Sequence, residues 1–166
     1  MIKTMMTRGL LSGIFAGLLL LAACSSDKCK NVNCQNGGTC DNGTCNCANG
    51  YEGTDCSVPS TKKFVGSWAA TDVCTTGSYT YSIGISASNV SVTGIVINNF
   101  GNFGTGVNVN ATVDGMNFMI PSQVASGITF SGSGSISVDG RTVSTTYTAI
   151  KDSTLNDFCT STWLLK

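Results

Sequence analysis

Alternating apolar and polar positions dominate the chain from residue 64 to its end. In the stretches YTYSIGIS and VNVNATV, apolar or aromatic residues recur at every second position. Because successive side chains of a β-strand point to opposite faces, this period of two predicts strands with one buried face. The expected inward positions are Tyr79, Tyr81, Ile83, Ile85, Val107, Val109, Ala111, Val113, Phe118, Ile120, Ile128, Phe130, Ile136 and Val138.

Turn-forming residues separate these segments at intervals of about ten residues. The expected turns lie at 76–77, 88–89, 99–104, 114–115, 131–134, 139–140 and 151–156. No segment shows a convincing helical period. About eight short antiparallel strands predict a mainly β domain over residues 64–166, either an up-and-down β-barrel or a β-sandwich.

The N-terminal residues have a different pattern. The run GLLSGIFAGLLLLAA carries no charge and follows Lys3 and Arg8. A basic start, an apolar run and small residues are typical of a signal peptide, and the run is short for a membrane span of about 20 residues. The segment ending LAAC resembles the lipobox of bacterial lipoproteins, which implies removal of residues 1–23 and acylation of Cys24, for example with palmitate. An ordinary secretory signal is the alternative.

The residues after Cys24 bear on location. In Gram-negative lipoproteins an acidic residue directly after the acylated cysteine retains the protein in the inner membrane. Ser25 and Ser26 stand here, so the resemblance implies an outer-membrane lipoprotein with residues 24–27 as its tether. Some relatives in the Bacteroidetes carry an acidic export cluster at this point, whereas this chain has only Asp27 before Lys28. Surface display and a periplasmic orientation both stay open.

A cysteine-rich stretch follows the tether. Six cysteines between residues 29 and 56 are separated by four, five, four, one and eight residues. Few other residues there are large and apolar, so disulfides must replace a hydrophobic core, as they do in small exported domains. The GGTCDNGTCNC segment predicts a two-stranded hairpin, because its Asn-Gly step supplies the positive φ angles of a tight turn. Spacing alone permits fifteen pairings of the six cysteines.

The motifs NGGTC, CNC and GYEGTDC make residues 28–57 resemble an EGF-like domain. The resemblance implies the pairs Cys29–Cys40, Cys34–Cys45 and Cys47–Cys56. A zinc site is the rival for any cysteine cluster, but an exported context and the absence of histidine disfavour it. Calcium is also disfavoured, because the SSDK segment before Cys29 offers one carboxylate to a cation that takes six to eight oxygens. We therefore expect no metal and no cofactor.

The β domain begins after a short polar linker, residues 58–63. Its opening, FVGSWAATDVC, resembles the first strand of lipocalin-like (calycin) barrels through Gly66-x-Trp68. The whole layout resembles Bacteroidetes-type lipoproteins that join an EGF-like domain to a lipocalin-like β-barrel; an immunoglobulin-like sandwich is the alternative. Two cysteines remain, Cys74 and Cys159, and we expect them to pair across the first and last strands.

Composition disfavours catalysis and nucleic-acid binding. The chain has no histidine and a formal net charge of zero, and its basic residues are scattered. The acids of the β domain mostly sit beside turn residues, although sequence leaves open a facing pair of Asp72 and Asp157. The GSGS segment at 132–135 does not lead into a helix, which argues against a phosphate loop.

Binding is the function class that the sequence favours. Lipocalin-like barrels often hold small apolar ligands in their mouth. The aromatic candidates for such a site are Trp68, Tyr79, Tyr81, Phe100, Phe103, Phe118, Phe130 and Tyr147, with Trp163 beside them. Core packing is the plainer role for most of them, whereas Phe100 and Phe103 lie in a Gly/Asn-rich loop suited either to recognition or to covering the barrel.

Three functions follow as hypotheses. The first is a binding or adhesion lipoprotein at the outer membrane, with the EGF-like module as spacer or contact surface. Its partner would be a protein, a glycan or a small hydrophobic ligand. The second is a calycin-type carrier of a small hydrophobic molecule. The third, an enzyme, is the one that the sequence favours least.

Overall fold

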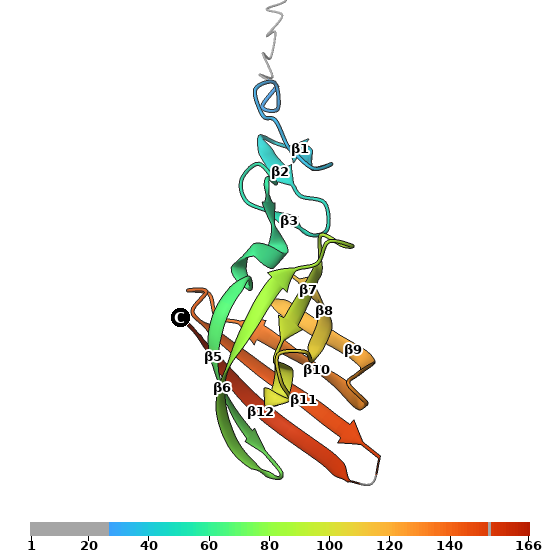
Figure 1. Cartoon of the computed structure of the whole chain (residues 1–166). Coiled ribbons are helices and arrows are strands. Elements are labelled where there is room, and N and C mark those ends of the chain that lie inside the picture. The colour runs from blue at the N-terminus through green and yellow to red at the C-terminus, as the bar shows by residue number, and fades with distance from the viewer. Residues whose placement is uncertain (1–26, 153) are drawn as a thin grey trace, which may run out of the picture.

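The computed structural model describes residues 27–152 and 154–166. The expected signal peptide and Cys24 lie outside these residues. Mainly β structure fills the described part, with a small disulfide-rich module followed by a closed barrel (Figure 1). Within the same residues, no helix has the length and apolar character needed to cross a bilayer.

Three disulfides hold the N-terminal module together. They join Cys29 to Cys40, Cys34 to Cys45, and Cys47 to Cys56, as the EGF-like resemblance implied. The expected hairpin is present, with β1 (Thr39–Asp41) antiparallel to β2 (Thr44–Asn46). Its turn is Asn42-Gly43, with φ angles of 52° and 90°. These angles suit the type I′ turn that the strand twist prefers.

The segment between module and barrel is structured. β3 (Tyr51–Glu52) pairs with β4 (Val58–Pro59), and the 3₁₀ helix η1 (Ser60–Lys63) follows directly. Lys63 Nζ lies 2.6 Å from a carboxylate oxygen of Glu52 and donates a 3.1 Å hydrogen bond to the carbonyl of Gly115 in the barrel. These contacts hold the module against one end of the barrel.

Eight antiparallel strands close the barrel, and each neighbours the next in sequence. They are β5 (Gly66–Cys74), β6 (Gly77–Ala87), β7 (Gly94–Asn98), β8 (Asn108–Asp114), β9 (Asn117–Ala125), β10 (Ile128–Ile136), β11 (Thr142–Lys151) and β12 (Leu155–Leu165). β12 pairs with β5, so the sheet has no free edge, which settles the choice between barrel and sandwich. A second 3₁₀ helix, η2 (Phe100–Asn102), lies between β7 and β8.

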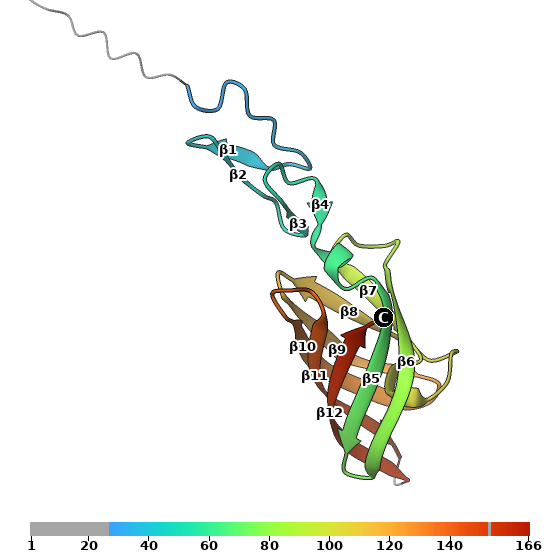
Figure 2. The same ribbon diagram turned by 90° about the vertical axis from the view of Figure 1, so that its left-hand side faces the viewer.

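The two ends of the barrel differ. At the near end, the module and the linker that follows it lie beside the β6–β7 and β8–β9 connections, and the β10–β11 connection lies at the same end of the barrel (Figure 2). Gly50 of the module approaches this end so closely that an added Cβ would lie 2.6 Å from a methyl carbon of Val92. The far end, which carries the β5–β6, β7–β8, β9–β10 and β11–β12 connections, points away from the module.

An aromatic column fills the barrel interior. Phe64 packs edge-on against Phe118, and Phe118 stacks on Trp163 with their centroids 5.7 Å apart. Phe100 then contacts Trp163 at 6.3 Å and Phe130 at 5.5 Å. Trp68 is fully buried and donates a 2.9 Å hydrogen bond to the carbonyl of Phe64. The column extends from η1 at the near end to η2 at the far end.

Two sequence expectations about this domain are wrong. Residues 131–134 do not form a turn but continue β10, and the turn lies at Ser126-Gly127 instead, with φ angles of 51° and 76°. Val138 is almost fully exposed, because β10 ends at Ile136 and the chain enters the next turn. Glycine was taken as a turn signal at 131–134, although glycine also occurs within a strand where neighbouring groups approach closely. The alternation was extended to Val138, although the strand had already ended.

Candidate functional site

The far end of the barrel contains a pocket of about 180 Å³, which we call the mouth pocket. Its walls come from the β5–β6 hairpin, from η2 and the loop after it, and from facing ends of β11 and β12. The lining residues are Cys74, Thr76, Tyr79, Gly101, Asn102, Phe103, Tyr147, Ala149, Leu155, Asp157 and Cys159. The pocket therefore combines aromatic rings, apolar groups, a disulfide and one carboxylate.

The loop from residue 99 to 106 forms one wall of the mouth pocket. Asn99 adopts a left-handed backbone, with φ 58°, and its side chain holds the loop by donating to the carbonyl of Ser82 at 2.8 Å. Phe100 is fully buried, with its ring centroid 4.5 Å from that of Tyr147, whereas Phe103 stays 36% exposed. One phenylalanine thus anchors the loop in the core, and the other faces the pocket.

Asp157 brings a buried charge to the mouth pocket. Its side chain is only 5% exposed. Oδ1 accepts hydrogen bonds from the Thr75 hydroxyl at 2.5 Å and the Thr76 amide at 3.0 Å, and Oδ2 accepts one from the Thr76 hydroxyl at 2.6 Å. Burial raises the pKa of Asp157, but these hydrogen bonds outweigh it, so the pKa lies below its ordinary value and the group is ionised at neutral pH.

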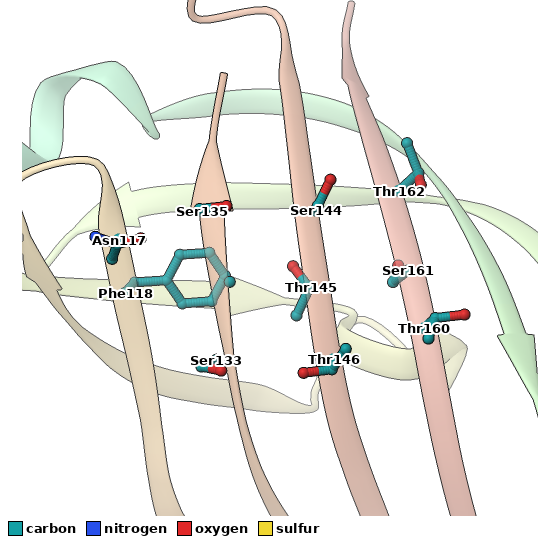
Figure 3. Close-up of a pocket in the computed structure, with 11 residues that line it drawn as sticks. Asn117, Phe118, Ser133, Ser135, Ser144, Thr145, Thr146, Thr160, Ser161 and Thr162 are labelled. Atoms are coloured by element: carbon teal, nitrogen blue, oxygen red, sulfur yellow. The ribbon is translucent and has the colours of Figure 1, made fainter. Parts of the chain in front are cut away.

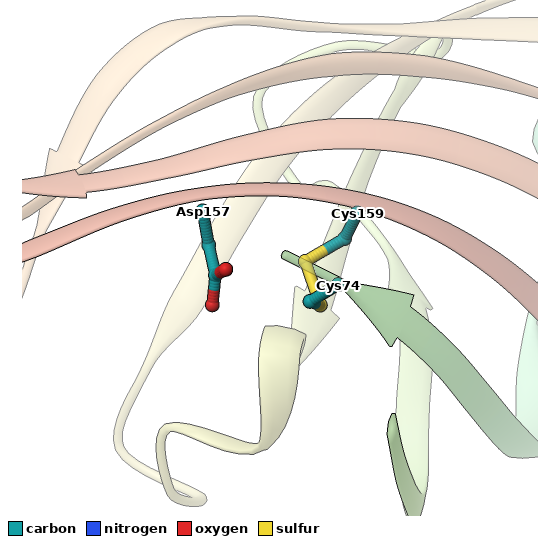
Figure 4. A group of neighbouring side chains, drawn as sticks. All are labelled: Cys74, Asp157 and Cys159. Carbon is teal, nitrogen blue, oxygen red and sulfur yellow. A yellow bond between two sulfur atoms is a disulfide. The ribbon is translucent and has the colours of Figure 1, made fainter. Parts of the chain in front are cut away.

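The barrel disulfide lies beside this carboxylate (Figure 4). Cys74 and Cys159 face each other across β5 and β12, and their sulfur atoms are bonded at 1.97 Å, as expected from the sequence. The two sulfurs and a carboxylate oxygen of Asp157 lie within 4.8 Å of one another, a spacing compatible with a metal site. Thiolates are the metal ligands, however, and both sulfurs are committed to the disulfide.

A second buried carboxylate, Asp72, lies deeper in the barrel and is fully inaccessible. It accepts hydrogen bonds from the hydroxyls of Tyr81 at 2.7 Å, Tyr147 at 2.5 Å and Ser161. Trp163 Nε1 donates to the same serine at 2.6 Å. Burial and the contact with Asp72 raise the pKa of both tyrosines, so their phenols stay protonated and act as donors.

The aromatic candidates from the sequence divide between pocket and core. Tyr79, Phe103 and Tyr147 line the mouth pocket. Three others take part in core packing: Phe100 and Phe130 pack against the pocket wall, and Tyr81 bonds Asp72. The remaining candidates, Trp68, Phe118 and Trp163, are buried among the other core residues.

A separate groove of about 550 Å³ crosses the outer face of β9–β12 (Figure 3). Two cross-strand rows of outward side chains flank it: Asn117, Ser135, Ser144 and Thr162 in one, and Ser133, Thr146 and Thr160 in the other. None of the described residues that line it is charged. The buried residues Phe118, Thr145 and Ser161 also line the groove. Hydroxyl-bearing positions are ordinary on the solvated face of an antiparallel sheet, whereas the mouth pocket places three aromatic residues beside a buried carboxylate, so the mouth pocket is the better candidate.

Sequence reasoning missed several mouth-pocket residues. Asp157 was attributed mainly to turns, yet it lies on β12 and points inward. The sequence does contain a pattern that predicts this inward direction, because Asp157 alternates with Cys159, Ser161 and Trp163 at every second position of one strand. Asp72 is likewise in phase with Trp68 on β5. Leu155 and Ala149 carried no signal, because their role depends on the loop that packs over the mouth.

No family model and no curated protein matches this chain.

Proposed function

We propose that the protein is an outer-membrane lipoprotein that binds a small molecule at the mouth of its barrel. The lipobox-like segment supports acylation of Cys24, and five residues further on Cys29 starts the disulfide-bonded module. The EGF-like module then acts as a spacer between membrane and barrel. Its ion pair between Lys63 and Glu52 and its close packing at Gly50 support a fixed connection.

The observation that carries this proposal is the position of the mouth pocket. It opens at the far end of the barrel, whereas the disulfide-bonded module, through which the proposed lipid anchor would be attached, lies at the near end. A ligand approaching from solvent would meet the pocket rather than the anchored end. Strand addition is a poor alternative, since the closed sheet offers no edge to an incoming peptide.

The size of the pocket restricts the ligand. Sites for drug-sized molecules enclose about 300–1,000 Å³. The mouth pocket has about 180 Å³, and the aromatic column occupies the interior below it. A calycin-type carrier that enclosed a small hydrophobic molecule within the barrel interior would need the column to move. We therefore favour a small ligand held at the mouth.

Binding also suits the chemistry better than catalysis does. Asp72 and Asp157 both lie inside the barrel, but each has its own set of hydroxyl donors, and no hydrogen bond joins them among the described residues. Each carboxylate is thus held in a fixed structural network. An acid–base pair would need two carboxyl groups facing a shared substrate.

Filling the mouth pocket tests the proposal. Ala149 is fully buried and lines the pocket, so Ala149→Leu adds side-chain volume where a ligand would sit. We expect small molecules that raise the melting temperature of the full chain to lose that effect in Ala149→Leu. A screen of small polar, charged and apolar compounds by thermal shift measures this.

The matched control is Ala69→Leu, which places the same change on β5 outside the lining of the pocket. It should leave ligand stabilisation unchanged. Equal stabilisation of wild type and Ala149→Leu by every active compound, or no active compound at all, would contradict a binding site at the mouth.

A further inference from the structure

We propose that the mouth pocket selects small organic cations, such as amines and quaternary ammonium compounds, with Asp157 as the charged partner and the surrounding aromatic rings as walls. This inference rests on the proposed function and adds the class of ligand. It depends on three properties of the pocket: an unneutralised carboxylate, an aromatic lining and a small volume.

The first property is the missing counter-charge. Asp72 and Asp157 are buried at 0% and 5% exposure, and no lysine or arginine is buried in the described part of the chain. The salt bridge between Lys63 and Glu52 lies at the near end, away from both carboxylates. Burying a charge is costly unless it is paired, and hydrogen bonds from hydroxyls compensate only in part. The negative field at the mouth therefore favours a cationic ligand.

The second property is the set of rings beside the carboxylate. The Tyr79 hydroxyl lies 3.1 Å from the Thr76 hydroxyl, which itself donates to Asp157, so this ring adjoins the carboxylate. Phe103 and Tyr147 line the same pocket. Aromatic faces attract cations within about 6 Å, and the attraction increases when water is excluded. The carboxylate and the aromatic rings together are complementary to an ammonium group that carries alkyl substituents.

The lining of the pocket favours an organic cation over a metal ion, and the third property, the small volume, limits the size of that cation. Calcium takes six to eight oxygen ligands, whereas the pocket offers one carboxylate whose oxygens already accept three hydrogen bonds. Leu155, Ala149 and the disulfide add apolar wall, which suits methyl or methylene groups. The volume of about 180 Å³ lies below that of drug-sized sites, so the ligand is small.

Choline and its uncharged carbon isostere, 3,3-dimethylbutan-1-ol, provide the direct test. Both would be titrated calorimetrically into the full chain in detergent. Because the two molecules have nearly the same shape, a difference in affinity reports the charge. We expect choline to bind at least about tenfold more tightly than the isostere.

Two pocket variants and one control variant locate the effect. Asp157→Asn removes the charge but retains a hydrogen-bond acceptor for Thr75 and Thr76, and it should weaken choline at least about tenfold with little change for the isostere. Asp114→Asn is the matched control, since Asp114 is exposed at the near end, and it should change neither affinity. Phe103→Leu keeps an apolar side chain and should also weaken choline, which keeps the proposal testable if Asp157→Asn does not fold.

The outcomes separate this inference from the proposed function. Equal affinities for choline and the isostere, or choline binding that both Asp157→Asn and Phe103→Leu leave unchanged, would overturn the selection of cations. If neutral compounds alone stabilise the chain, in a manner that Ala149→Leu abolishes, the mouth binds ligands but not through charge. If nothing binds there, both proposals fail.

Discussion

Replacing Cys74 and Cys159 together with alanine is expected to lower the free energy of unfolding of the barrel by up to about 4–5 kcal/mol. The disulfide joins residues 85 apart in sequence, and closing so long a loop restricts the unfolded chain strongly. It also links β5 to β12, the pair of strands that closes the sheet. Urea unfolding followed by tryptophan fluorescence measures the barrel alone, because both tryptophans of the chain, Trp68 and Trp163, lie in it.

A neighbouring pair on the same two strands provides the control. Val73 and Thr160 face each other on the outer side of β5 and β12, and both are exposed. Alanine at these two positions should change the stability by no more than about 1 kcal/mol, as is usual for surface sites. A comparable loss in both double variants would show that the strand pair, rather than the disulfide, sets the stability.

Trp163→Ala is expected to destabilise the barrel by about 3–5 kcal/mol. The indole is fully buried, stacks on Phe118 and contacts Phe100 edge-on, so its removal leaves a cavity in the middle of the aromatic column. The lost donor to Ser161 adds to the cost. Urea unfolding monitored by circular dichroism, together with fluorescence of the remaining Trp68, gives the change.

The next residue along β12 is the comparison for this prediction. Leu164 is 54% exposed on the opposite face of the strand, so Leu164→Ala should cost about 0.5 kcal/mol or less. Trp163→Phe keeps a ring in the column and should fall between the two. A loss at Leu164 equal to that at Trp163 would contradict the assignment of inward and outward faces.

The regular alternation of the sequence was enough to predict most strands. It placed Val109, Val113 and Ile136 on inward faces, and all three are buried. The disulfide pairs could also be predicted from the sequence. The resemblance to EGF-like domains implied the three pairs of the module, and the two cysteines that remained, Cys74 and Cys159, were expected to pair with each other. These features depend on local period and cysteine count, which a sequence displays directly.

Closure of the barrel was not decided by the local pattern. Alternation is the same in a sandwich and in a barrel, and the choice depends on the pairing of β12 with β5, which begin far apart in the chain.

The glycines of the GSGS segment also could not be interpreted from the local sequence. An added Cβ at Gly134 would lie 2.5 Å from the ring of Phe118, and one at Gly132 would lie 2.7 Å from Cβ of Tyr147. Glycine is required at Gly134 because the Phe118 ring occupies the inner face, and at Gly132 because the backbone of the neighbouring strand β11 approaches closely.

The mouth pocket was only partly predictable, for a similar reason. Sequence identified Tyr79, Phe103 and Tyr147 as candidates, and the structure brings them together. It could not show that Phe100 would turn into the core while Phe103 stays at the rim, since both belong to the same Gly/Asn-rich loop. The direction of each side chain is set by backbone angles at Asn99 and Gly101, whose φ values are 58° and 65°.

Mapping choline onto the protein by amide NMR tests the central claim most directly. In spectra of the full chain in detergent, we predict that choline shifts the signals of Thr76, Gly101, Phe103 and Asp157 at the mouth of the barrel. Signals from the near end, such as Asp114 and Gly115, should not move. Shifts centred instead on Ser133, Thr146 and Thr160 of the outer groove, or no shifts at saturating choline, would contradict a cation-binding mouth.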